Sequence, residues 1–193
     1  EAAQQLIHAE AREVDLLDVG GQLYCCMAVL GFYPALALAQ PEYHGNWLVK
    51  TFKVTLAAVR SVALFPPLHL VVRDKDGLEV QRRTRIALIA NNDYEDLFGV
   101  IPRRCGLDGG YFTIYVFNHR TRWALFVSFL KWLIGRWKQD RELTMIHATE
   151  VEINVRGHRK VAIMRDGEVD KIPVPFRIKL LPKALRMLVP PAA

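Results

Sequence analysis

The chain has 193 residues, of which 51% are apolar and 24% are charged, and this length is ordinary for one globular domain. Its apolar fraction excludes a disordered segment, and its apolar runs are shorter than the roughly 18 residues of a membrane-spanning helix. The formal net charge of +6 suits contact with phosphates, an anionic membrane surface or nucleic acid, and it does not choose among them.

The cysteines indicate a reducing compartment. Cys25 and Cys26 are adjacent and cannot easily bridge to each other, and no spacing that includes Cys105 resembles a zinc or disulfide framework. The chain shows no basic and apolar leader, so we expect a cytoplasmic protein. Because residue 1 is Glu and the first Met is Met27, inside a patterned segment, we also expect the chain to be a piece of something longer.

The first elements in chain order are a helix and then strands. The apolar positions of Glu1–Arg12 are spaced as in a short amphipathic helix, and Val14–Leu17 then favours a strand. A turn at Gly20 and Gly21 leads to the apolar run Leu23–Leu30, which is short enough for one buried strand. The sequence predicts two strands joined by a tight turn.

A second helix and three strands follow. Asn46–Leu64 has apolar residues at helical spacing, and Pro66 ends the pattern. The hydrophobic period then changes to two, which is typical of strands, and the turn Asp74–Gly77 interrupts it. Three strands are predicted, over His69–Arg73, Leu78–Arg85 and Ile86–Asn91.

The remaining elements favour a sandwich. Tyr111–Phe117 is the strongest predicted strand, with both faces buried, and Arg120–Lys138 has the pattern of a basic, aromatic, amphipathic helix. The last third, Met145–Val189, alternates again, with short strands over Glu150–Val155, Lys160–Arg165, Glu168–Val174, Phe176–Leu181 and Ala184–Val189. We therefore predict a mainly β fold, an antiparallel β-sandwich with two or three inserted or flanking α-helices.

Familiar catalytic motifs are few. The sequence has no Walker-type phosphate loop, HExxH, CxxC or GxSxG, and its six histidines show no metal-ligand spacing. The run Gln81–Arg85 shows no interleaving of basic and aromatic residues as on a single-stranded nucleic-acid platform, and no nucleic-acid partner is expected. The run Gln81–Arg85 is interpreted as a solvated sheet face, with phosphate binding as the alternative.

Two Asp-Gly turns are the candidate sites. Asp166 and Glu168 flank Gly167 after a predicted strand, where a tight turn either projects two carboxylates into a cleft or is an ordinary hairpin turn with exposed acids. Asp108 precedes two glycines and a buried strand, and it either helps form an oxygen-lined site for a hard cation such as Mg²⁺ or belongs to a plain turn. The Arg120–Lys138 helix either lies on an anionic membrane or packs on the core.

Four segments, in this order along the chain, carry a family resemblance: REVDLLDVGGQLYCCMAVLGF, RIALIANN, LDGGYFTIYV and MRDGEVDKIPVPFRIKLLPKALRMLVP. Together they resemble the C-terminal domain of the diacylglycerol kinase-like and sphingosine kinase-like lipid kinases. The last segment is the most specific, because its Asp-Gly-Glu turn is followed by a strand, a Leu-Pro-Lys and an Ala-Leu-Arg strand. The resemblance spans essentially the whole chain and implies that residues 1–193 form a single β-sandwich domain that receives a lipid.

In that family an N-terminal domain carries a Gly-Gly-Asp-Gly-Thr loop that holds the nucleotide, and this chain contains no such loop. The resemblance therefore implies partnership with an N-terminal nucleotide-binding domain, which would bind most of the ATP. It also implies Mg²⁺ as a cofactor, a lipid substrate and peripheral association with a membrane surface. The oligomeric state is left open, a homodimer included.

The resemblance also assigns roles to residues. Asp166 and Glu168 fall at the family's interdomain cleft, with Glu168 favoured as the base-like residue and Asp166 as its orienting or metal-network partner. Asp108, with the carbonyls of Cys105 and Gly110, resembles the family's structural Mg²⁺ site. The chain departs from the family there, since two acidic residues before a single glycine are common and this chain has one acid before two glycines.

We therefore expect the C-terminal, lipid-binding part of an ATP-dependent lipid kinase, which phosphorylates a hydroxyl of diacylglycerol, a sphingoid base or a similar amphiphile and is inactive alone. The alternative is a non-catalytic lipid-binding or membrane-surface β-domain. The two amphipathic helices and the charge of +6 fit that alternative as well.

Overall fold

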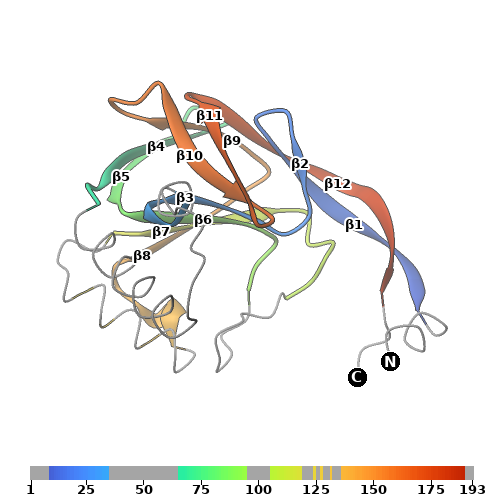
Figure 1. Cartoon of the computed structure of the whole chain (residues 1–193). Coiled ribbons are helices and arrows are strands. Elements are labelled where there is room, and N and C mark those ends of the chain that lie inside the picture. Colours follow the sequence, from blue (N-terminus) through green and yellow to red (C-terminus); the bar gives the residue numbers. More distant parts are fainter. Residues whose placement is uncertain are drawn as a thin grey trace, which may run out of the picture.

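The computed structural model describes residues 9–34, 65–94, 105–118 and 136–189, together with Ala124, Val127 and Lys131. Twelve strands in this part of the chain form two sheets that pack face to face as a β-sandwich (Figure 1). All the ladders within the sheets are antiparallel. The predicted fold class, a mainly β antiparallel sandwich, is confirmed.

Each sheet has six strands. The first, in spatial order, consists of β2 (Leu23–Tyr24), β1 (Glu10–Val19), β12 (Phe176–Val189), β9 (Glu150–Val155), β4 (Leu68–Asp74) and β5 (Glu79–Thr84). The second consists of β11 (Glu168–Pro173), β10 (Lys160–Arg165), β3 (Met27–Gly31), β6 (Ile86–Asn91), β7 (Phe112–Phe117) and β8 (Leu143–Ala148). The β10–β11 hairpin and β8 therefore lie at opposite edges of the second sheet.

The core lies between the two sheets, and alternation along the strands produces it. In β9, the residues Val151, Ile153 and Val155 are buried while the residues between them are half-exposed. Burying such a side chain fully contributes roughly 1.5 to 3 kcal/mol. Strand β7 is buried on both faces from Phe112 to Val116, as its continuous apolar and β-branched sequence predicts.

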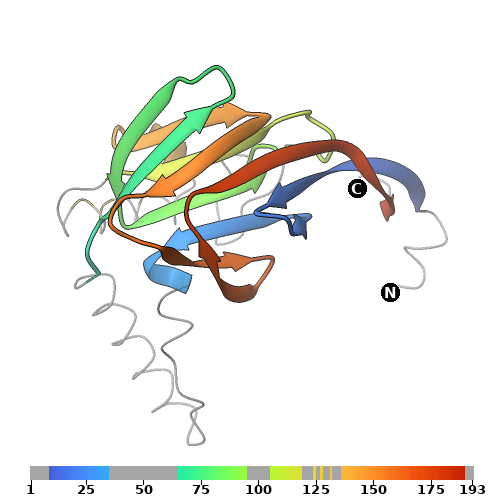
Figure 2. The same ribbon diagram turned by 90° about the horizontal axis from the view of Figure 1, so that it is seen from above.

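Strands β1 and β12 form a long two-stranded ribbon that extends beyond the sandwich (Figure 2). The sequence predicted two strands where the structure has β12 as one strand of 14 residues, so this detail was wrong. The ladder passes the Leu-Pro-Lys segment by a register shift, with Val14 opposite Leu185 and Leu16 opposite Leu181. The backbone of Lys183 takes a positive φ of 52° at that bulge, and its N–H donates to the buried carboxylate of Asp15.

The run Leu23–Leu30 was predicted as one strand, and that prediction was wrong. The structure bends the chain at Cys25 and Cys26, so that β2 pairs in the first sheet and β3 in the second. After the bend Ala28, Val29 and Leu30 are buried, whereas before it Leu23 is exposed and Tyr24 is half-buried, so the continuous apolar run does not correspond to continuous burial. The partner that holds the bend is Asp166, 140 residues away in sequence from Cys26.

The predicted helices fall mostly outside the described residues. Glu10–Arg12 belongs to β1, so the first predicted helix was wrong for those residues, and its earlier part lies outside the described ranges, as does all of Asn46–Leu64. Within Arg120–Lys138, three described residues are helical (Ala124, Val127 and Lys131), and a 3₁₀ turn spans Trp137–Gln139. In the described part, no helix has the length and apolar character of a membrane span.

The backbone at Gly31, the last residue of β3, leaves no room for a Cβ. Its φ is 114°, and a Cβ there would lie 2.1 Å from the backbone oxygen of Arg85. We expect Gly31→Ala to lower the free energy of unfolding by about 3 kcal/mol. The new Cβ would force the backbone of Arg85 to move, and alanine would also be strained at this positive φ. Urea unfolding measures this change.

Gly77→Ala is the matched control. Gly77 also has a positive φ, 84°, but a Cβ there meets nothing within 4 Å. We expect a loss of about 1 kcal/mol from backbone strain alone. Equal losses in the two variants would show that the contact between Gly31 and Arg85 is not a constraint.

Candidate functional site

The Asp-Gly turn of the last third is a two-residue hairpin turn. Arg165 and Glu168 are the last facing pair of the β10–β11 ladder, and Asp166 and Gly167 connect them with φ of 46° and 98°. Positive φ at both central residues is the geometry that Asp-Gly favours in hairpins. The hairpin predicted from this sequence is confirmed.

The carboxylate of Asp166 anchors the bend between β2 and β3. One oxygen, Oδ1, accepts from the N–H groups of Cys26 and Met27, both at 2.9 Å. The other, Oδ2, accepts from Cys25 at 2.9 Å and Cys26 at 3.3 Å. The Asp166 N–H in turn donates to the Met27 carbonyl at 3.0 Å. Both carboxylate oxygens of Asp166 therefore accept hydrogen bonds from the backbone of the bend.

Glu168 differs from Asp166 in its hydrogen bonding. Both residues are exposed, but within the described part of the chain the Glu168 side chain has no hydrogen bond or ion pair. It lies at the start of β11, on the edge strand of the second sheet. Of the two acids in this turn, Glu168 is therefore the one whose carboxylate oxygens accept no hydrogen bond from the described residues.

A buried arginine and a tyrosine complete the surroundings of the turn. The Arg165 side chain is 6% exposed; it pairs with Asp170 at 3.0 Å, and its guanidinium lies over the Tyr24 ring, 5.0 Å from the centroid. Burial raises the pKa of the Tyr24 hydroxyl above its ordinary value, and the carboxylates of Asp170, Asp166 and Glu168 raise it further against the opposing charge of Arg165. Sequence reasoning missed Tyr24 and Arg165, because their role depends on contact between β2 and β10.

Hydrogen bonds to Asp15 and Asn92 hold the loop Cys105–Gly110, the other predicted site, in place. Gly110 donates its N–H to Asp15 at 2.9 Å, and Gly109 donates to the Asn92 side chain at 2.8 Å. Asp15 is 1% exposed, and its two oxygens accept from Gly110 and Lys183. Sequence reasoning missed Asp15, which sits between apolar residues in a strand pattern and shows its purpose only through these contacts.

A chain of hydrogen bonds joins the two Asp-Gly turns. The side chain of Asn91 donates to the Asp15 carbonyl at 2.6 Å and to the Cys25 carbonyl at 3.0 Å. Because Asp15 holds the Gly110 loop and Cys25 is held by Asp166, Asn91 links both predicted sites. The structure therefore brings the two turns into one connected region of the fold.

Asp108 itself is exposed at this loop, and Cys105 donates its N–H to the Asp93 carbonyl at 2.9 Å. Within the described ranges, no three His, Cys, Asp or Glu side chains come together in a group that could hold a metal ion. The carboxylates of Asp15 and Asp93 already accept hydrogen bonds, the first from backbone N–H groups and the second from the side chains of Tyr115 and Lys138. A magnesium ion held by Asp108 and the carbonyls of Cys105 and Gly110 stays a prediction.

A family model described as the YegS C-terminal NAD kinase beta sandwich-like domain matches residues 37–189. The match covers most of the chain, which therefore belongs to this family of kinase-like C-terminal domains.

Three solved structures from Bacillus anthracis str. Sterne share the fold. One, described as a diacylglycerol kinase, is 13% identical with a TM-score of 0.59, and the chain covers 55% of it. Two described as candidate diacylglycerol kinases are 18% and 16% identical, with TM-scores of 0.65 and 0.63 and coverage of 59% and 58%. Each match covers 94% of this chain, which thus spans somewhat more than half the length of these relatives.

Asp166→Asn tests the anchoring role. The amide keeps the shape and the tolerance of positive φ, but it loses the charge that strengthens the bonds to Cys25, Cys26 and Met27. We expect the free energy of unfolding to fall by about 2 kcal/mol, measured by urea unfolding. Glu168→Gln, the matched control on the same turn, should change it by less than about 0.5 kcal/mol. A smaller effect for Asp166→Asn than for Glu168→Gln would contradict the assignment.

The Tyr24 hydroxyl reports the charge of this region. Because its pKa is raised in the folded state, folding favours the protonated phenol, and stability is lost as pH rises from about 10 through the folded pKa. We expect the unfolding free energy of the native protein to fall more steeply above pH 10 than that of Tyr24→Phe. Parallel curves for the two proteins would show that Tyr24 is not perturbed.

Proposed function

We propose that this chain is the lipid-binding C-terminal part of an ATP-dependent lipid kinase, and that Glu168 accepts the proton of the lipid hydroxyl. The observation that carries the proposal is the different hydrogen bonding of two acids in one turn. Both oxygens of Asp166 accept hydrogen bonds from backbone N–H groups, whereas the Glu168 carboxylate, two residues later, has no partner in the described part. Membership in a kinase-like family supports phosphoryl transfer as the chemistry.

The proposed step is a displacement at phosphorus. The lipid hydroxyl oxygen forms a bond to the γ-phosphorus of ATP, the bond from that phosphorus to the β–γ bridging oxygen breaks, and ADP leaves. The hydroxyl proton passes to the Glu168 carboxylate, directly or through one water. Mg²⁺ bound with the nucleotide would neutralise charge on the phosphates, and we place both with a separate nucleotide-binding domain.

Asp166 has a positioning role in this proposal. Its bonds to Cys25, Cys26 and Met27 fix the turn against the β2–β3 bend, so that Glu168 keeps one place relative to the sheet. The buried Arg165, which pairs with Asp170 and lies over the Tyr24 ring, connects the same hairpin to β2. A base held this way needs little reorganisation when substrate arrives.

The substrate class is an amphiphile with a free hydroxyl, such as diacylglycerol or a sphingoid base. Support comes from the ordered motifs of the chain and from structural neighbours that are described as diacylglycerol kinases. The chain spans 55% to 59% of those neighbours. We therefore propose that transfer requires a nucleotide-binding domain and that residues 1–193 alone are inactive.

The test uses the natural gene product with diacylglycerol or a sphingoid base in mixed micelles and labelled ATP. We expect Glu168→Gln to lower kcat by about 100-fold or more, with KM for the lipid changed by less than about twofold, because the base acts chiefly in the transition state. Glu13→Gln, an exposed acid on β1, is the control and should leave kcat unchanged. Full kcat in Glu168→Gln would refute the role of Glu168, and robust transfer by residues 1–193 alone would refute the need for a second domain.

A further inference from the structure

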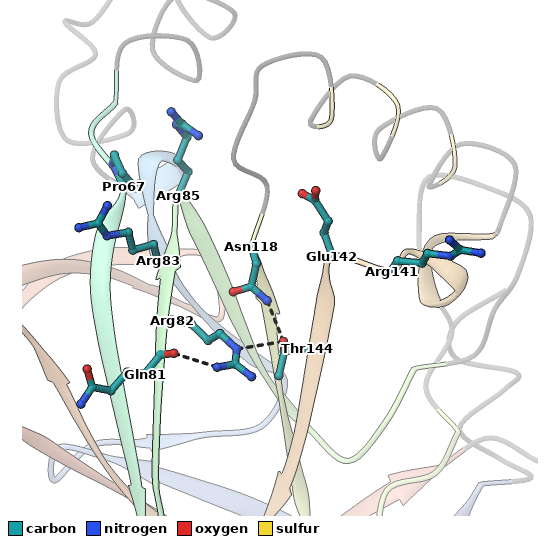
Figure 3. A pocket seen from close by; sticks show the side chains of 9 residues that line it. All are labelled: Pro67, Gln81, Arg82, Arg83, Arg85, Asn118, Arg141, Glu142 and Thr144. Atoms are coloured by element: carbon teal, nitrogen blue, oxygen red, sulfur yellow. Dashed lines mark hydrogen bonds between the residues drawn. The ribbon is translucent and has the colours of Figure 1, made fainter.

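An arginine-lined hollow lies between the free edges of the two sheets, away from the Asp166 turn. Strand β5 is the edge of the first sheet and β8 is the edge of the second, and the hollow of about 1050 Å³ opens between them (Figure 3). In the second sheet β8 is four strands from β10, which corresponds to roughly 19 Å. The hollow is therefore separate from the turn to which we assign phosphoryl transfer.

The lining has more positive than negative side chains. Among the described residues it includes Arg82, Arg83, Arg85 and Arg141 and one acid, Glu142. In the described part of the chain, no carboxylate forms an ion pair with Arg82, Arg83 or Arg141.

The same hairpin shows the opposite pattern on its far end. There Arg73 pairs with Glu79 at 3.1 Å and with Glu152 at 3.6 Å. Within the described β4–β5 hairpin, the arginine near the turn is therefore ion-paired, whereas Arg82 and Arg83 at the other end of β5 are not.

Two of the arginines are held in place by their own contacts. Arg82 reaches across to β8, with Nε 3.4 Å from the Thr144 hydroxyl, and its Nη1 donates to the Gln81 carbonyl at 2.9 Å (Figure 3). Arg85 donates from Nε to the Phe65 carbonyl at 3.2 Å. A guanidinium has five N–H donors, so Arg82 keeps three for a ligand, and its fork suits the oxygens of a phosphate.

Two residues that line the hollow each carry an acceptor oxygen without a hydrogen-bond donor. Asn118 Oδ1 and Glu142 Oε2 are shielded from solvent and have no donor among the described residues. The Asn118 amide nitrogen is already used, since it donates to Thr144 at 2.7 Å. Buried acceptors are ordinarily hydrogen-bonded, and hydroxyl groups of a bound molecule would satisfy both.

We propose that this hollow binds a phosphate ester of a small polyol, of which glycerol phosphate is the simplest example, either free or as a phospholipid headgroup. The arginines take the phosphate, and the oxygens of Asn118 and Glu142 accept from the hydroxyl groups. Arginines on an edge strand also discourage pairing with other chains. That role alone requires no ligand, so a binding measurement separates the two explanations.

Calorimetric titration of the full-length protein with sn-glycerol 3-phosphate tests the site. We expect binding that weakens at least tenfold in Arg82→Gln/Arg83→Gln and less than twofold in Arg159→Gln/Arg186→Gln. The control pair removes the same charge from exposed arginines outside the hollow. Glycerol without phosphate should not bind. Arg83→Gln alone, at an exposed residue whose side chain has no hydrogen bond or ion pair in the described part, should weaken binding at least threefold without affecting the fold.

Sedimentation with vesicles distinguishes the sources of the phosphate ester. Binding at 150 mM salt that requires phosphatidylglycerol in phosphatidylcholine vesicles, and that is lost in Arg82→Gln/Arg83→Gln but kept in the control pair, supports a membrane-borne headgroup. Binding of soluble glycerol phosphate without vesicle binding supports a free ester. Binding of neither probe, or equal loss in the control pair, overturns the proposal.

Discussion

The bend between β2 and β3 depends on one carboxylate. Cys25, Cys26 and Met27 present three consecutive N–H groups at the bend, and Asp166 accepts from all three. These bonds stabilise the conformation in which the chain leaves the first sheet and enters the second. The Asp-Gly turn is therefore a structural joint between the layers as well as an exposed loop.

This joint explains how the two acids of the turn can differ in purpose. A carboxylate that accepts several backbone N–H groups is fixed and has little capacity left for another proton donor, whereas Glu168 is exposed and unpartnered in the described part. Asn91 and Asp15 extend the same network to the loop before β7, so both Asp-Gly turns share one framework. The proposed kinase role uses this rigidity to place a single free acid.

Much of the fold could be predicted from local pattern, and the site only in part. The continuous apolar and aromatic run of β7 and the Asp-Gly hairpin are local signals, and both were predicted correctly. The split of Leu23–Leu30 could not be predicted, since the cause of the bend is a side chain about 140 residues away. The role of Asp15, whose partners are Gly110 and Lys183, could not be predicted for the same reason. Nor could the contact of the buried Arg165 with the Tyr24 ring. Long-range contacts therefore mark the limit of what the sequence alone could show.

Amide hydrogen exchange at Cys25, Cys26 and Met27 is the decisive measurement for the role of Asp166, because it reports on the bond to this carboxylate at each donor. We expect slow exchange at these three amides in the native protein and in Glu168→Gln, and fast exchange in Asp166→Asn while the amides of β7 stay protected. Unchanged protection in Asp166→Asn, or equal loss in Glu168→Gln, would contradict this role.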